Sequence, residues 1–239
     1  MHTQALEQIP AVARDSVAQY AERVLAYGGN HVLGLILYGP IAGARFDPTL
    51  HMIHSVLVLD GMGLEILRKL SGEGHRFGRR RITAPMVMTP DFLQASRDTF
   101  PLELIEIQQQ RLVLVGEDYF AGITFDPAHV RLQCERELKA LSVAMRQAVV
   151  ADGDKESSIQ RAALPAMFNL LRVLRGMLWV KGKTESLVSS ALLAEVEALA
   201  GRHLPGIRQA LDAPSAVDWL VFERLYNDVE ALGQIADGW

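Results

Sequence analysis

The amino-acid sequence predicts an α+β fold in its first half, followed by an all-α helical bundle. Strand-like and helix-like patterns are mixed before Asp126, whereas only helical periodicity follows it. Two short apolar segments are typical of neighbouring buried strands: 32–38, which is bounded by glycines, and 53–59, which ends at Asp60-Gly61. This segregation predicts a mixed sheet with flanking helices over residues 1–126 and a helical domain over 127–239.

Length and composition exclude several classes of protein. The 239 residues suit one large or two smaller domains, and 22% charged residues is ordinary for a globular protein. The net charge of -4 argues against a general nucleic-acid-binding protein, so we expect no nucleic-acid partner. The single Cys134 excludes an internal disulfide and a cysteine-based zinc site, and it is consistent with a reducing, cytoplasmic location.

Two apolar stretches have nearly the length of a membrane span. The stretch 24–44 lacks charged residues, but glycine-containing turns at 28–30 and 39–40 interrupt it. The stretch 162–180 contains two arginines and an asparagine, which is typical of a packed helix. We therefore expect no membrane segment.

The elements follow from apolar spacing and from turn residues. The first half is predicted to contain helices over 6–27 and 64–70, a helix from Pro90, and strands over 32–38, 53–59, 82–88, 101–107 and 111–115. Thr89 is predicted to cap the helix that Pro90 begins. The second half is predicted to contain helices over 130–149, 159–178, 185–200 and 216–235.

Several short motifs carry a family resemblance. They are Leu37-Tyr38-Gly39, Phe100-Pro101-Leu102-Glu103, Ile107-Gln108, Arg111 and Val115-Gly116-Glu117-Asp118. With these motifs in this order, the chain resembles the nucleotidyltransferase superfamily, and in particular bacterial aminoglycoside-adenylyltransferase-like proteins with a helical C-terminal domain. The resemblance implies a Gly-Ser turn that holds nucleotide phosphates, and an Asp-x-Asp pair on the next strand that holds two magnesium ions. It also implies a third carboxylate from a later strand.

The chain departs from this pattern at the positions that carry the chemistry. Gly39-Pro40 replaces Gly-Ser, and Pro40 has neither a backbone N–H nor a hydroxyl to offer a phosphate. Met52 and His54 stand at the Asp-x-Asp positions, and thioether and imidazole groups are poor ligands for Mg²⁺. Glu103 is the remaining carboxylate. It is the candidate catalytic residue and, with His54, the candidate metal ligand. Glu103 could equally be the polar side of an edge strand, and for His54 a partly buried, hydrogen-bonded histidine is the favoured alternative.

Cations in the helical half form a second group of candidates. The resemblance implies that the helical domain offers cations to a triphosphate, and Arg172, Arg175 and Lys181 are the residues placed to do so. Together with Gly39 and Pro40 they make up the predicted nucleotide-binding set. Salt bridges to acidic residues on neighbouring helices would explain the arginines equally well.

Three functional hypotheses follow. The first is a nucleotidyltransferase-like pseudoenzyme that still binds a nucleotide or small molecule in the cleft between its domains. The second is an active nucleotidyltransferase that moves a nucleoside monophosphate to a hydroxyl acceptor; only this hypothesis requires Mg²⁺, held by His54 and Glu103. The third is a non-catalytic interaction module whose helical half forms a homodimer.

Overall fold

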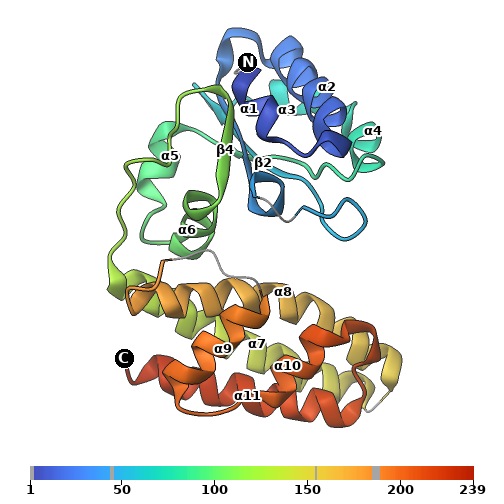
Figure 1. Ribbon diagram of the computed structural model, residues 1–239, viewed down its shortest axis with the longest axis vertical. Coiled ribbons are helices and arrows are strands. Elements are labelled where there is room, and N and C mark those ends of the chain that lie inside the picture. Colours follow the sequence, from blue (N-terminus) through green and yellow to red (C-terminus); the bar gives the residue numbers. More distant parts are fainter. Residues whose placement is uncertain (1–2, 44–45, 154, 185–188) are drawn as a thin grey trace. The chain divides into compact units, whose positions relative to one another are not determined.

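The computed structural model describes residues 3–43, 46–153, 155–184 and 189–239 (Figure 1). The chain forms two compact units. The first comprises Met1–Arg97 with Glu106–Thr124, and the second comprises Asp98–Ile105 with Phe125–Trp239. The chain therefore enters the second unit, returns to the first and then completes the second.

The first unit contains a four-stranded mixed sheet. Its strands are β1 (Val32–Tyr38), β2 (His54–Leu59), β3 (Met86–Met88) and β4 (Arg111–Gly116), in the order β3-β2-β1-β4. β1 runs antiparallel to β2 and β4, while β2 and β3 are parallel. The predicted mixed sheet is confirmed, and β1 has the predicted bounds.

Helices flank this sheet. They are α1 (Thr3–Gln8), α2 (Ala11–Gly28), α3 (Leu64–Ser71), α4 (Gly74–Gly78) and α5 (Pro90–Ala95). The predicted helix over 6–27 is divided at Pro10, which cannot donate a backbone hydrogen bond. Thr89 caps α5 as predicted, because its side chain accepts a hydrogen bond from the Phe92 N–H.

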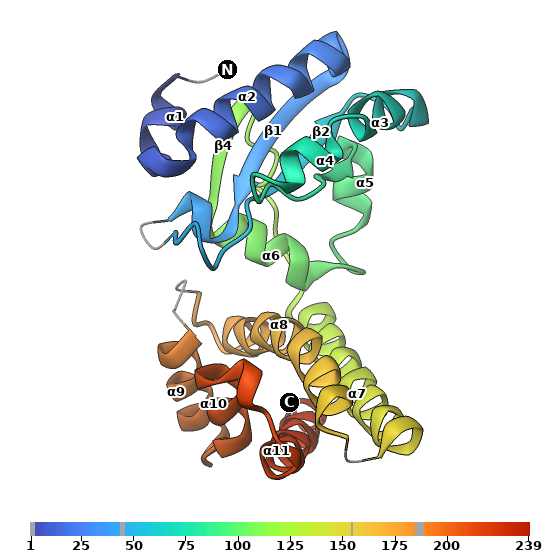
Figure 2. The ribbon, with the colours of Figure 1, turned by 90° about the vertical axis from the view of Figure 1, so that its right-hand side faces the viewer.

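The core of the first unit lies between α2 and one face of the sheet, and Figure 2 shows α2 running along the strands. Val17 and Val24 of α2 belong to the same buried cluster as Leu35 and Leu37 of β1. Tyr20 joins them and hydrogen-bonds the Ser55 hydroxyl of β2 at 2.8 Å. Strand alternation then turns Tyr38 and His54 toward the opposite face of the sheet.

The predicted strand over 101–107 is wrong, because this segment is the helix α6 (Pro101–Gln109). Glu103 and Glu106 are only half-buried, whereas the apolar residues between and around them are buried. Polar positions three residues apart fit one side of a helix and not the alternation of a strand. The predicted strand over 82–88 is likewise shorter than expected and retains only Met86–Met88.

Within the described residues, the second unit consists of helices. They are α7 (Pro127–Asp152), α8 (Glu156–Val180), α9 (Ser189–Ala200), α10 (Pro205–Asp212) and α11 (Trp219–Asp237), together with the start of α6. The four predicted helices are present, although the predicted start of the third, at 185, lies outside the described residues. α10 was not predicted, because its eight residues are too few to show a helical period clearly.

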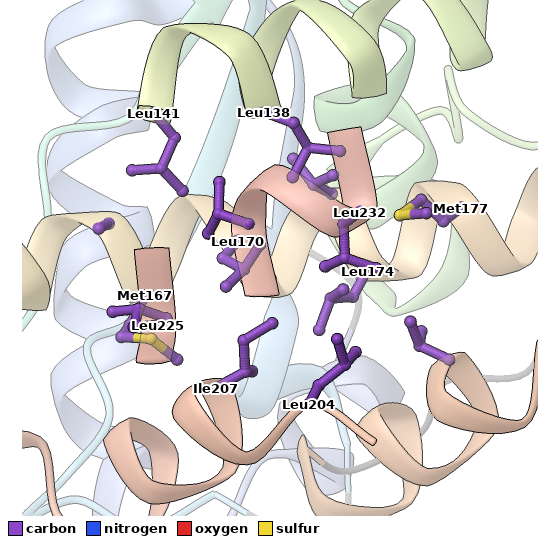
Figure 3. Packing of buried hydrophobic residues seen from close by; sticks show 14 of the residues in the cluster. Leu138, Leu141, Met167, Leu170, Leu174, Met177, Leu204, Ile207, Leu225 and Leu232 are labelled. Carbon is purple, nitrogen blue, oxygen red and sulfur yellow. The ribbon is translucent and has the colours of Figure 1, made fainter. Parts of the chain in front are cut away.

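Leucine, isoleucine and methionine side chains from these helices fill one core (Figure 3). Leu138 and Leu141 of α7 face Leu170 and Leu174 of α8, and residues of α10 and α11 close the cluster. Among the described helices, α8 is the one whose length and hydropathy would suit a membrane span. A buried core helix meets the same criteria, and Leu170 and Leu174 of α8 are fully buried here.

α10 is fixed to α11 by a buried carboxylate. Asp228 of α11 accepts hydrogen bonds from the N–H groups of Gly206 at 2.7 Å and Ile207 at 3.1 Å. These amides belong to the first turn of α10, where backbone donors have no partner inside the helix. The two helices approach so closely that a Cβ atom at Gly206 would overlap the backbone of Arg224 and Leu225.

Candidate functional site

The candidate site of the first unit lies where β1 ends and β2 begins. Tyr38 and His54 are register partners across the two strands, and their rings are 5.6 Å apart between centroids. Gly39 follows with a φ of 75°, a left-handed conformation that glycine adopts without strain. The segment Gly39–Ala42 is a single 3₁₀ turn and not the start of an α-helix.

The backbone donors at the two predicted residues of this turn are already used or missing. The Gly39 N–H donates to the Gln110 carbonyl at 2.9 Å, and Pro40 has no N–H. A phosphate therefore finds no free backbone donor at either of the predicted turn residues. Gln110 was missed in the sequence, where nothing marks a backbone carbonyl as a partner.

His54 is a half-buried, hydrogen-bonded histidine. Its Nδ1 lies 3.1 Å from the Thr83 hydroxyl, which itself donates to the Ile53 carbonyl at 3.2 Å. When the one hydrogen of the hydroxyl is donated to the carbonyl, Nδ1 is the donor to Thr83. In the neutral ring the lone pair then lies on Nε2.

The residues at the start of β2 do not fit Mg²⁺. Ile53 is buried, so Met52 and His54, on either side of it, share the other face of the strand. They present a thioether and an imidazole, whereas Mg²⁺ prefers carboxylate oxygens. In the part of the chain that the structure describes, no three His, Cys, Asp or Glu side chains are grouped to hold a metal ion.

Glu103 lies in the second unit, in the first turn of α6. Its carboxylate accepts hydrogen bonds from Arg172 at 3.1 Å and from the Gln133 amide at 2.8 Å. The Gln133 Oε1 in turn accepts the Leu102 N–H at 2.8 Å, which satisfies a free donor at the helix start. Gln133 was missed in the sequence, although a glutamine beside the apolar positions 130 and 134 of a helix is a signal for a buried polar partner.

The remaining predicted cations also lie in the second unit. Arg172 forms a salt bridge to Glu103. A salt bridge to an acidic residue on a neighbouring helix is the alternative to phosphate binding that the sequence analysis gave for the arginines. Arg175 is half-buried one turn further along α8. The Lys181 ammonium lies 4.1 Å from the centroid of the Trp239 ring, a cation–π contact that holds both side chains.

Arg111 and Asp118, both in motifs that carry the family resemblance, form a paired contact. The Arg111 guanidinium donates from Nε to Asp118 Oδ1 at 2.8 Å and from Nη2 to Oδ2 at 2.7 Å. These hydrogen bonds hold the pKa of the Asp118 carboxyl below its usual value, despite the opposing effect of partial burial. Gln108 anchors the same loop by donating to the carbonyls of Phe120 and Ile123.

A mixed sheet with flanking helices, followed by a helical region, is the architecture of an α+β nucleotidyltransferase fold. The chain is similar in structure to the spectinomycin adenyltransferase AAD(9) from Enterococcus faecialis, solved with ATP and spectinomycin. The TM-score is 0.56 at 10% sequence identity, over 90% of this chain and 98% of that one. No protein-family model matches the chain, and no curated protein matches it by sequence. The similarity therefore shows the fold.

Proposed function

We propose that this protein binds a nucleoside phosphate or a related small molecule and has lost efficient nucleotidyl transfer. The nucleotidyltransferase-like fold supports the binding part of the proposal. The structurally similar adenyltransferase was solved with ATP and spectinomycin, so a nucleotide or a small polar molecule is the ligand class to test. In this proposal Arg172, Arg175 and Lys181 supply positive charge for the phosphates.

The observation that carries the loss of transfer is the chemistry at the ends of β1 and β2. Metal-assisted transfer needs oxygen ligands that place divalent ions on the attacking and leaving oxygens. Met52 and His54 stand where the family pattern has carboxylates. The Gly39 N–H already donates a hydrogen bond to the Gln110 carbonyl. Ligand binding does not require these groups, whereas transfer does.

Calorimetric titration tests both parts of the proposal. ATP, GTP, CTP and UTP are titrated into the full chain with Mg²⁺, with Mn²⁺ and with a chelator. We expect binding that persists in the chelator, and no pyrophosphate release with hydroxyl acceptors such as aminoglycosides. Binding that requires the metal, together with pyrophosphate release, would show an active enzyme. No heat at millimolar nucleotide would refute the proposed binding.

Charge variants locate the binding. Arg175→Ala should weaken nucleotide binding, because it removes a guanidinium that the proposal assigns to the phosphates. Arg136→Ala is the matched control, since this arginine is 55% exposed on α7 and is paired with Glu137. Equal affinities for the two variants would exclude α8 as the phosphate-binding helix.

We also propose a cytoplasmic location, where nucleoside triphosphates are available. Cys134 is a free, buried thiol, and burial raises its pKa to about 12. Such a thiol is protonated at neutral pH and is a poor nucleophile. Fractionation of cells that express a tagged full-length chain tests this location.

A further inference from the structure

One aromatic side chain of α8 lies outside the hydrophobic core. Phe168 is 70% exposed, although the adjacent Met167 is buried at 5% exposure. Large aromatic rings are normally buried in a core or placed against a partner. Phe168 is therefore an aromatic side chain that the core of the second unit leaves in contact with solvent.

Phe168 is in line with three arginines along α8. Arg161, Phe168, Arg172 and Arg175 are spaced seven, four and three residues apart, so they share one face of the helix. We name these four residues the α8 stripe. The buried residues Ala163, Leu170 and Leu174 point the other way, into the core of the second unit.

The composition of the α8 stripe selects among ligands. A purely apolar partner would have to desolvate guanidinium groups beside the ring, which is costly. An inorganic anion would use the arginines and leave the ring in water. A nucleoside phosphate uses both, since its base stacks on an aromatic ring and its phosphates bind guanidinium groups.

We propose that Phe168 is the base-stacking residue of a nucleoside phosphate site on α8. Arg172 lies one turn from the ring, roughly 6 Å along the helix axis, and Arg175 roughly 10 Å. This places the phosphates beyond the ribose, toward Arg175. The hydrogen bond to Glu103 at 3.1 Å holds the Arg172 guanidinium in a defined orientation. The inference rests on the proposed nucleotide binding and identifies the residue that recognises the base.

Stacking on a phenylalanine ring carries little base selectivity, because every base has a π-face. ATP, GTP, CTP and UTP should therefore bind with similar affinities, and each should bind more tightly than tripolyphosphate. The difference between a nucleotide and tripolyphosphate measures the contribution of the ring.

Titration of full-length variants with ATP and with tripolyphosphate tests the assignment. We expect Phe168→Ala to weaken ATP binding about tenfold, within the range measured for base–aromatic stacking, and to leave tripolyphosphate binding unchanged. Phe168→Tyr should bind ATP like the wild type. Val150→Ala is the control, because Val150 is an 87% exposed apolar residue on α7.

Two results would overturn the assignment while leaving the proposed function intact. One is wild-type ATP affinity in Phe168→Ala. The other is an equal loss of ATP and tripolyphosphate binding, which would indicate a structural effect of the substitution. Failure of the proposed function looks different, because the wild-type protein would then bind none of the four nucleotides.

Discussion

Arg172 donates a hydrogen bond to Glu103 across 3.1 Å. The sequence places one of these residues among the nucleotide-binding cations and the other among the metal ligands. In the structure they form a salt bridge, with 36% of the Arg172 side chain and 22% of the Glu103 side chain exposed. The pair ties the first turn of α6 to α8 inside the second unit.

A double-mutant cycle measures this pair. Because both side chains are partly exposed, we expect a coupling free energy of about 0.5–1 kcal/mol between Glu103→Ala and Arg172→Ala. Urea unfolding of the wild type, the two single variants and the double variant gives the value. A coupling of zero would show that the contact does not stabilise the fold.

Introducing the acidic residues of the nucleotidyltransferase pattern should create a metal site. The variant with Met52→Asp, His54→Asp and Pro40→Ser places two carboxylates at alternate positions at and just before the start of β2. We expect it to bind Mn²⁺ and Mg²⁺ measurably by calorimetry, whereas the wild type binds them much more weakly. A variant with Met52→Ala, His54→Ala and Pro40→Ser is the control. Equal metal affinity in the two variants would mean that these positions do not form the site.

The buried Tyr20 makes stability depend on alkaline pH. Burial raises the pKa of Tyr20 to about 12, from an ordinary value of about 10. Between these values the unfolded state has released a proton that the folded state retains, so the free energy of unfolding falls as pH rises from about 10 to about 12. Below about pH 10 the tyrosine is protonated in both states, so its contribution to the free energy of unfolding is fully present.

Tyr20→Phe should flatten this dependence and lower stability at neutral pH. Removing the tyrosine hydroxyl leaves the buried Ser55 hydroxyl without its partner, at a cost of roughly 1–3 kcal/mol. Adding Ser55→Ala should recover part of the loss. Urea unfolding at about pH 9 and about pH 11 compares the variants, and an unchanged pH slope in Tyr20→Phe would contradict the assignment.

Two glycines provide a matched pair of stability changes. Gly206→Ala should destabilise the second unit by roughly 1–3 kcal/mol, because its Cβ would overlap the backbone of Arg224 and Leu225. Gly233 lies within α11. In Gly233→Ala the nearest neighbour of the new Cβ would be the Leu138 Cβ, at 4.0 Å. It should stabilise the helix by up to about 1 kcal/mol. Chemical denaturation that gave both changes the same sign would refute the packing argument.

The sequence predicted the elements whose pattern is local. β1 is a run of apolar residues closed by glycine at both ends, and the long stripes of α7 and α8 repeat over several turns. α6 was predicted wrongly, because its mixture of apolar residues and two glutamates can be matched to a strand or to a helix. Leu102 and Ile105, at its start, are buried in the core of the second unit three residues apart, which fits a helix.

The candidate site was predictable only in part. The apolar runs on either side of Gly39 and Met52 predicted two neighbouring strands, which β1 and β2 confirm, whereas the assignment of Met52 and His54 to the Asp-x-Asp positions stays a prediction. The partners of these residues come from distant segments, as Gln110 does for Gly39 and Gln133 does for Glu103. Such pairings depend on tertiary structure, which periodicity and motif spacing do not contain.

The segment Asp98–Ile105 belongs to the second unit, and this matters for the design of fragments of the protein. Leu102 packs so close to Gly176 that a Cβ there would overlap its side chain, and Leu102 and Cys134 belong to the same buried cluster. A recombinant fragment that starts at 127 would lack Leu102. We expect its Cys134 thiol to react with iodoacetamide faster than the buried thiol of the intact chain does. We also expect a fragment that starts at 98, and so keeps Leu102, to be more soluble.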